Sequence, residues 1–163
     1  QAEYAYKNSG GVVGLTTGLV DMDKLLGGLQ RSDLLILAGR PSMGKTALAV
    51  NLAYNACEAL WREAQTTGKS TKEVGCVGFF SLEMSAEQLT TRMLSSSSKL
   101  NSHKIIQGKL TSEEFAHLVR TSNSMASMPF FIDDTPALTI ASLRTRARRL
   151  KRQSNLRLLV VDY

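Results

Sequence analysis

A short apolar segment, a glycine-rich loop and the start of an amphipathic helix follow one another directly, and this arrangement constrains the fold most. Leu34–Ala38 (LLILA) predicts a buried strand, because continuous apolar runs are typical of strands covered on both faces. Gly39–Thr46 (GRPSMGKT) fits the pattern G-x-x-x-x-G-K-[ST] of a P-loop. A helix is predicted to begin near Lys45, with Leu48, Leu52 and Ala56 on one face. The order strand, loop, helix is the context that this motif requires.

The residue types in the loop suit the binding of a nucleotide's phosphates. Glycines let the backbone wrap tightly, so that several N–H groups point at phosphate oxygens, and the dipole of the following helix adds favourable potential. Lys45 is expected to reach the β- and γ-phosphates, and the Thr46 hydroxyl to ligate Mg²⁺. ATP and Mg²⁺ are the predicted ligands, and the predicted nucleotide-binding residues are Gly39, Ser42, Met43, Gly44, Lys45, Thr46 and Ala47. The alternative is a tight glycine turn beside a surface lysine.

A second candidate for holding the metal lies at the other end of the chain. Leu156–Asp162 predicts an apolar strand that ends in a carboxylate, which is the form of a Walker B element. At the carboxyl edge of a parallel sheet, Asp162 is expected to hold Mg²⁺, usually through water. Asp133, at the end of the shorter apolar segment Pro129–Asp133, is the rival carboxylate. Many buried strands also end in an aspartate for structural reasons.

Hydrolysis needs a further group that orients or deprotonates the attacking water. The residue directly after Asp162 is Tyr163, so the base must come from elsewhere. Glu83 is the best candidate, because it follows the predicted strand Val74–Ser81 at the edge where ligands bind in open α/β sheets. Glu83 and Lys45 are therefore the predicted catalytic residues. The alternative role for Glu83 is that of a first-turn carboxylate favoured by a helix dipole.

Strand and helix signals alternate along the rest of the chain. Two helices are predicted to begin at Ser85 and Thr111, each with a glutamine or glutamate at the capping-box position three residues on. Another helix is predicted from about Thr139. The polar segment Gln65–Glu73 predicts an exposed loop. Apolar strands alternating with amphipathic helices favour an α/β fold, with a parallel sheet flanked by helices on both faces.

The interior positions of these helices follow from their apolar spacing. Leu89 and Met93 are predicted to line the buried face of the helix from Ser85. In the helix from Thr139, the predicted buried stripe is Ile140, Leu143, Ala147 and Leu150. Phe79 and Phe80 are expected in the core rather than in a site.

Charge is distributed unevenly along the 163 residues. The segment between Thr135 and Val161 carries +7 and no acidic residue, and its basic residues are Arg144, Arg146, Arg148, Arg149, Lys151, Arg152 and Arg157. The remaining 13 basic and 14 acidic residues leave the rest of the chain at −1. Contact with nucleic acid, subunit packing, contact with an acidic partner and a plain solvated face are all open, since no aromatic residue interleaves the cations for base stacking.

Length and composition exclude several classes of protein. The chain suits one domain or part of one, with 43% apolar and 21% charged residues, as in ordinary globular proteins. No apolar run is long enough to span a bilayer, and no secretory signal opens the sequence. Cys57 and Cys76 give neither a disulfide framework nor metal-ligand spacing. We expect a cytoplasmic protein without membrane contact.

The motifs, taken together and in order, resemble those of one family. GLVDMD precedes a GGLQ turn, and GRPSMGKT, FFSLEMSAEQL, IDDTP, LRTRARRL and LLVVDY follow. Over Gly14–Tyr163 the chain is similar to the DnaB family of bacterial replicative DNA helicases. The resemblance implies a RecA-like P-loop ATPase core that forms a hexameric ring (a homo-hexamer) around single-stranded DNA. It also implies 5′→3′ unwinding of duplex DNA at replication forks, driven by ATP hydrolysis, and work with a primase and a helicase loader.

Site residues carry over by position from the same resemblance. Ser42, Gly44, Lys45 and Thr46 match the P-loop of the family, Glu83 matches the glutamate that activates water, and Asp162 matches the Walker B aspartate. The family's domain continues past this strand, and the later segments supply its γ-phosphate-sensing glutamine, DNA-binding loops and arginine finger. In the family a linker joins this domain to an amino-terminal primase-interacting domain, so residues 1–13 are expected to be an interdomain linker remnant. Residues 14–163 are expected to be the N-terminal part of a RecA-like ATPase domain.

Two alternatives to the helicase stay open at this point. One is a RecA- or RadA-like recombination ATPase, which shares the fold. The other, for these 163 residues alone, is a nucleotide-binding or assembly module without turnover of its own. Unwinding by these residues alone is not expected.

Overall fold

The computed structural model describes residues 13–163, and within them three strands form one parallel sheet. The strands are β1 (Cys76–Ser81), β2 (Phe130–Asp133) and β3 (Leu156–Asp162), and their order across the sheet is β2-β1-β3. Phe80 of β1 pairs with Asp133 of β2, and Ser81 pairs with Asp162 of β3. The carboxyl ends of all three strands therefore meet at one edge, as a parallel sheet requires.

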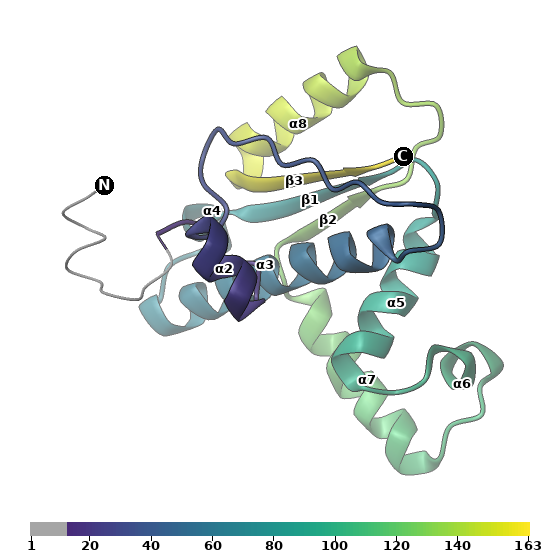
Figure 1. Cartoon of the computed structure of the whole chain (residues 1–163). Coiled ribbons are helices and arrows are strands. Elements are labelled where there is room, and N and C mark those ends of the chain that lie inside the picture. Colours follow the sequence, from purple (N-terminus) through teal and green to yellow (C-terminus); the bar gives the residue numbers. More distant parts are fainter. Residues whose placement is uncertain (1–12) are drawn as a thin grey trace.

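Helices cover both faces of this sheet (Figure 1). The long helix α3 packs on one face against β1 and β3, and α8 packs on the other face against the same two strands. The segment formed by α5, α6 and α7 extends away from the sheet beyond α3 (Figure 1). The helix bounds are α2 (Val20–Leu26), α3 (Lys45–Thr67), α4 (Thr71–Val74), α5 (Ala86–Ser98), α6 (Ser102–Gln107), α7 (Ser112–Ala126) and α8 (Ile140–Ser154). The predicted α/β class is confirmed.

Side-chain caps fix where the later helices begin, as the sequence predicts. The Ser85 hydroxyl accepts a hydrogen bond from the Gln88 amide at the start of α5, and Thr111 accepts one from the Glu114 amide at the start of α7. Both capping boxes are complete. Thr139 caps α8 in the same way, by accepting from the Ser142 amide at 3.2 Å. Each cap satisfies a backbone donor that has no partner inside its helix.

The core lies between the sheet and α3, and α5 closes one side of it. Phe79, Phe80, Leu89 and Met93 are all buried, as predicted. The fully buried face of α3 is rotated from the prediction, because Leu48 and Leu52 are only half-buried. Its buried residues are Val50, Ala53, Ala56, Cys57, Leu60 and Ala64. Four of these six have small side chains, which let the helix lie close to the strands.

The two cysteines belong to this core and are free. Burial raises the pKa of the Cys57 thiol to about 12 and that of the Cys76 thiol to about 11. Both thiols therefore stay protonated at neutral pH and pack as small apolar groups.

On the other face, α8 sits close to β1 because β1 has a glycine there. A Cβ at Gly78 would come within 3.1 Å of the Leu150 side chain. Leu143, Ala147 and Leu150 are half-buried as predicted, but the prediction for Ile140 is wrong, since this side chain is 87% exposed. Ile140 is the first residue of α8 and lies before the turn that packs against the sheet.

The prediction of a buried strand at Leu34–Ala38 is wrong in this structure. The segment belongs to no strand, and Leu34 and Ile36 are 86% and 83% exposed. Figure 1 shows it as an extended coil that leads into α3. Apolar composition shows that a segment is suited to burial, but a strand also needs a neighbour whose backbone groups complete its hydrogen bonds. The strand β3 pairs with β1, and neither β1 nor β3 pairs with Leu34–Ala38.

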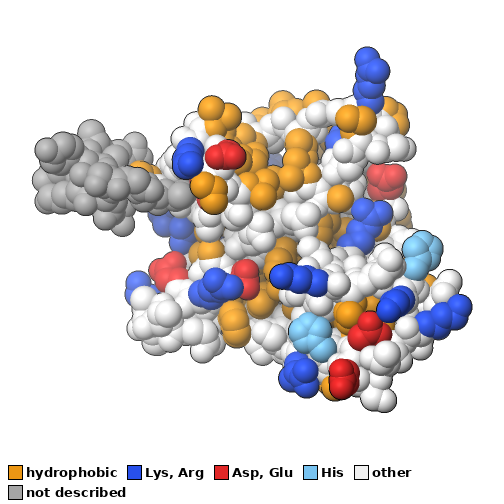
Figure 2. All heavy atoms as spheres, turned by 60° about the horizontal axis from the view of Figure 1, so that its bottom comes forward, with side chains coloured by type: hydrophobic (Ala, Val, Ile, Leu, Met, Phe, Trp, Pro, Cys, Tyr) orange, Lys and Arg blue, Asp and Glu red, His pale blue; other side chains and the backbone are white. Residues whose placement is uncertain are grey.

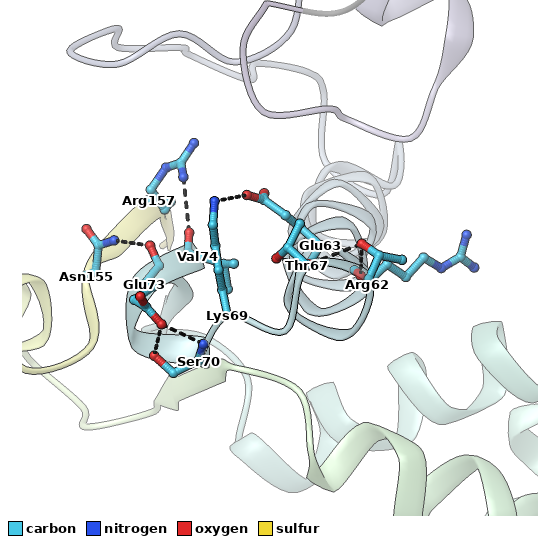
Figure 3. A network of polar contacts seen from close by, with 10 residues as sticks. Arg62, Glu63, Thr67, Lys69, Ser70, Glu73, Val74, Asn155 and Arg157 are labelled. Carbon is cyan, nitrogen blue, oxygen red and sulfur yellow. Dashed lines mark hydrogen bonds and ion pairs between the residues drawn. The ribbon is translucent and has the colours of Figure 1, made fainter.

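The prediction of an irregular loop at Gln65–Glu73 is also wrong, although the segment is exposed. The helix α3 continues to Thr67, where Gly68, with a φ of 68°, ends it. The short helix α4 follows, and Ser70 and Glu73 form a complete capping box at its start (Figure 3). The polar composition correctly indicates exposure, but exposure does not exclude helix. Because α4 extends to Val74, β1 begins at Cys76 rather than at Val74.

Contacts from the end of α8 and the start of β3 hold α4 in place. The Asn155 side-chain amide donates to the Glu73 carbonyl at 3.0 Å, and the Arg157 guanidinium donates to the Val74 carbonyl at 3.1 Å (Figure 3). These bonds join the end of α8 and the start of β3 to the turn before β1. Among the described residues, no helix is both long and apolar enough to cross a membrane. All but the last residue of the predicted linker, 1–13, lies outside the described part.

Candidate functional site: the P-loop and the sheet edge

The P-loop motif lies at the start of α3 and is exposed. Gly44 has a φ of 86° and Ser42 a φ of 63°, so the chain turns through the left-handed region twice just before the helix. The Met43 amide closes this turn by donating to the Arg40 carbonyl at 3.3 Å. At Gly44 a residue with a side chain would be strained, because left-handed backbone is costly for anything but glycine. The left-handed backbone conformation therefore explains why the motif has a glycine at this position.

The first turn of α3 offers unpaired backbone donors. Gly44 is its N-cap and has no side chain, so no side-chain oxygen accepts from the amides at the helix start. The Lys45 stem lies against Gly39, where a Cβ would stand 3.5 Å from Lys45 Cγ. The loop thus combines free N–H groups, the positive end of a 23-residue helix and a lysine at one place. That donor set fits the phosphates of a nucleotide.

Asp162 ends β3 at the same edge of the sheet. One of its carboxylate oxygens, Oδ2, is buried and has no hydrogen-bond partner among the described residues. A buried polar atom without a partner is uncommon and costly, so it points to a group that binds there. The half-buried Thr46 and Asp162 both carry oxygen atoms of the kind that Mg²⁺ prefers as ligands. These residues fit the predicted metal.

The loop after β1 places Glu83 at this edge. The Leu82 amide donates to the Asp162 carbonyl at 2.8 Å, and the Met84 amide donates to the Ser81 hydroxyl at 3.1 Å. Glu83 lies between these two anchored residues, and its side chain is exposed. The carboxylate is therefore held on a short, fixed turn and faces solvent, where it is free to contact a water molecule.

The Asp133 carboxylate is already paired with other side chains. Its carboxylate accepts hydrogen bonds from the Arg146 guanidinium, at 2.6 Å for Oδ2, and from the Thr135 hydroxyl at 2.7 Å. Burial alone would raise the pKa of Asp133, but the bonds from Arg146 and Thr135 outweigh it and hold the pKa below its usual value. This carboxylate joins β2 to α8, while the rival Asp162 keeps an unpartnered oxygen. Of the two rival carboxylates, only that of Asp162 therefore keeps an oxygen without a partner among the described residues.

The elements bring the candidate residues to one end of the molecule. In Figure 1, α3 begins at the edge where β1 and β3 end, so the P-loop, Glu83 and Asp162 share that side. Within residues 13–163, Lys45 and Glu83 form no ion pair with each other or with another side chain. Since Leu34–Ala38 is outside the sheet, the loop is positioned by the packing of α3 on β1 and β3.

Two residues of this edge were missed by sequence reasoning. Ser81 is buried, pairs with Asp162 across the sheet and accepts from the Met84 amide, so it shapes the Glu83 turn. Asp134 accepts from the Ala86 amide at 2.8 Å and so joins the segment after β2 to the first turn of α5. The signal for Ser81 was its place at the end of an apolar run two residues before Glu83. Nothing local distinguishes Asp134 from its neighbour.

Comparison with known proteins agrees with this arrangement. Residues 14–163 match the family described as the DnaB-like helicase C terminal domain. The chain is 52% identical over 159 residues to a replicative DNA helicase DnaB of Rickettsia felis, covering 98% of this chain and 32% of that protein. It is 39% identical over 161 residues to the replicative DNA helicase DnaB of Geobacillus stearothermophilus, covering 99% of this chain and 33% of that protein. The chain thus spans about a third of the length of these relatives.

Solved structures share the fold. A DnaB-like replicative helicase, whose title also mentions its interactions with primase, superposes with a TM-score of 0.81 at 23% identity. That match covers 99% of this chain and 36% of the solved chain. A solved ATPase domain matches with a TM-score of 0.82, covering 99% of this chain and 54% of that one. The predicted RecA-like fold, a parallel sheet flanked by helices, is confirmed. The family model matches residues 14–163, which are nearly all of the described residues. The chain therefore belongs to the DnaB-like helicase C-terminal domain family.

Proposed function

We propose that residues 14–163 are the ATP-binding part of a replicative DNA helicase, in which ATP hydrolysis drives 5′→3′ unwinding. The single observation that carries the proposal is the shared sheet edge. It combines a P-loop with free amides, an aspartate with an unpartnered buried oxygen, and an exposed glutamate on an anchored turn. The relatives are named as replicative helicases, which does not favour the recombination-ATPase alternative. Residues 1–13 are proposed to be a linker remnant.

In this site the loop residues bind the nucleotide. The backbone amides of Gly44, Lys45, Thr46 and Ala47 are proposed to donate to phosphate oxygens, with Gly39, Ser42 and Met43 shaping the loop. The Lys45 ammonium adds a positive charge at the β- and γ-phosphates. Thr46 and Asp162 would hold Mg²⁺, which neutralises charge developing on the phosphates when bound. The residues of this chain therefore supply both the positive charge and the oxygen ligands.

Glu83 is proposed to act on water. Its carboxylate accepts a proton from the attacking water as the water oxygen bonds to the γ-phosphorus. The bond from that phosphorus to the oxygen bridging to the β-phosphate breaks, so the products are ADP and inorganic phosphate. Lys45 stabilises the charge that this leaves on the phosphates.

The proposal is tested by ATP hydrolysis in the full-length protein with Glu83→Gln. Phosphate release should fall by about 10²–10⁴-fold, the usual contribution of a general base, while binding of ATP persists. Glu87→Gln is the matched control, since Glu87 is exposed on the first turn of α5 and lies outside the proposed site. Equal phosphate release in wild type and Glu83→Gln would contradict the role of Glu83.

A second function applies to the 163 residues alone. Helicases of this type complete their sites between subunits, and an arginine finger from a neighbour contributes about 10³–10⁵ in rate. Without that group, the chain is proposed to bind ATP and hydrolyse it at background level. Phosphate release above background from the 163-residue chain alone would contradict this.

The assembly and its partners are proposed from the family. We propose that the full-length protein forms a homo-hexamer around single-stranded DNA in the cytoplasm, and that it works with a primase and a helicase loader. The solved DnaB-like helicase, whose title mentions interactions with primase, supports the choice of that partner. Mass measurement of the full-length protein, with and without primase, tests the hexamer and the contact with primase.

A further inference from the structure

The helix α8 carries a concentration of positive charge that the nucleotide site does not use. It lies on the face of the sheet opposite α3, the helix that begins at the P-loop (Figure 1). Its exposed cations are Arg144, Arg146, Arg148, Arg149, Lys151 and Arg152, and the helix has no acidic residue. By contrast, Figure 2 shows basic and acidic side chains interspersed on the face that α5–α7 occupy. The charge of α8 is a local feature of one surface.

Three of these cations form contacts within the protein. Arg146 pairs with Asp133 and anchors α8 to β2. Arg149 donates to the Gln153 side chain, and Lys151 donates to Asn155 and to the Leu156 carbonyl at the end of the helix. Within residues 13–163, no hydrogen bond or ion pair engages the guanidinium groups of the other three, which are Arg144, Arg148 and Arg152.

These three arginines form one row. They are spaced four residues apart, so they lie on the same side of the helix at intervals of about 6 Å along its axis. The row begins one turn into α8 and reaches its last turn. Unpaired guanidinium groups at regular spacing suit a ligand that presents anionic groups repeatedly.

We propose that this arginine row, Arg144, Arg148 and Arg152, binds the phosphodiester backbone of single-stranded nucleic acid. Interfaces with proteins are centred on buried apolar or aromatic anchors, and no large apolar side chain lies on the outward side of α8 between these arginines. The exposed Ile140 lies one turn before Arg144, at the start of the helix, and is a single apolar side chain. Phosphate contacts need no such anchor. The absence of aromatic side chains from α8 also means that bases are not stacked there, so binding is independent of sequence. The proposal goes beyond the nucleotide site and does not depend on Glu83.

The test uses the full-length protein and a fluorescein-labelled oligothymidylate, with affinity measured by anisotropy over a series of salt concentrations. The variant is Arg144→Gln/Arg148→Gln/Arg152→Gln. Each phosphate contact with a single strand contributes about −0.7 to the slope of log K against log salt. Losing three contacts should make the slope shallower by about 2. Affinity at low salt should fall by at least about tenfold.

A matched control removes the same charge from another surface. Arg92→Gln/Lys109→Gln/Arg120→Gln changes three exposed cations of the α5–α7 segment and should keep the wild-type slope. Two single variants separate a lost contact from misfolding. Arg148→Lys keeps the positive charge and should retain the phosphate contact that Arg148→Gln loses. ATP hydrolysis without DNA should be the same in all these variants, so failure of the nucleotide site is recognised separately.

Three results would overturn the proposal. The first is a wild-type slope and affinity in the triple α8 variant. The second is an equal loss in both triple variants, which would reflect net charge alone. The third is unchanged oligothymidylate binding together with lost binding of polyglutamate, which would assign the row to an acidic protein.

Discussion

The Leu82 amide donates a hydrogen bond of 2.8 Å to the Asp162 carbonyl, which joins the end of β1 to the end of β3. Asp162 carries the unpartnered carboxylate oxygen, and Glu83 is the residue directly after Leu82. The backbone segments that carry the two carboxylates proposed to act on the nucleotide are therefore joined directly. Segments some 80 residues apart in sequence meet in this one contact.

Asp162→Asn should abolish the effect of Mg²⁺ on ATP binding. The substitution keeps the shape of the side chain but removes the negative charge that would hold the ion. We expect Mg²⁺ to strengthen binding in the wild type by on the order of tenfold, which is the worth of one charge-assisted contact, and not in the variant. Titration of a fluorescent ATP analogue with and without Mg²⁺ measures this. Asp133→Asn is the control, and loss of the Mg²⁺ effect there instead would identify Asp133 as the ligand.

The Asp133–Arg146 pair should stabilise the fold in a pH-dependent way. Because the pKa of Asp133 is lowered in the folded state, its contribution is fully present above the ordinary value of 3.8 and is lost as the pH falls below it. At pH 7, Asp133→Asn should lower the free energy of unfolding by about 1 kcal/mol, since the pair is partly exposed. Urea unfolding of wild type and variant should give free energies that converge as the pH falls below 3.8. A gap that widens on acidification would contradict the pairing.

Two truncations test where the core lies. Leu60→Ala should cost about 2–5 kcal/mol in the free energy of unfolding, because Leu60 is 1% exposed between α3 and the sheet. Ile36→Ala should change the free energy of unfolding by no more than about 0.5 kcal/mol in the 163-residue chain, since Ile36 is 83% exposed. Chemical denaturation measures both. An equal cost at the two positions would show that Leu34–Ala38 is part of the core after all.

Sequence alone predicted the features that depend on neighbouring residues. The caps at Ser85 and Thr111 were predicted because a cap is formed within one turn, and the start of α8 near Thr139 was predicted from its apolar spacing. The strand at Leu156–Asp162 was predicted because its apolar run is continuous. The positions of Glu83 and Asp162 follow from where β1 and β3 end in the parallel sheet. Lys45 is instead placed by the packing of α3 on β1 and β3.

Features that depend on distant partners were not predictable from the pattern. Leu34–Ala38 has the composition of a strand, but pairing depends on which edges are available, and the segment remains exposed. Asp133 and Asp162 both end apolar strands, and they differ in their contacts, since Arg146 and Thr135 bind Asp133. The role of Ser81 depends on its pairing with Asp162, more than 80 residues later.

The most direct test of the central claim is equilibrium binding of a fluorescent ATP analogue to wild type and Lys45→Ala, each with Mg²⁺. Lys45 contributes a charge-assisted contact worth about 1.5–3 kcal/mol, so its loss should weaken binding by on the order of 10–100-fold. Lys109→Ala, an exposed lysine away from the P-loop, should bind as the wild type does. Equal affinity in wild type and Lys45→Ala would contradict a nucleotide site at the P-loop.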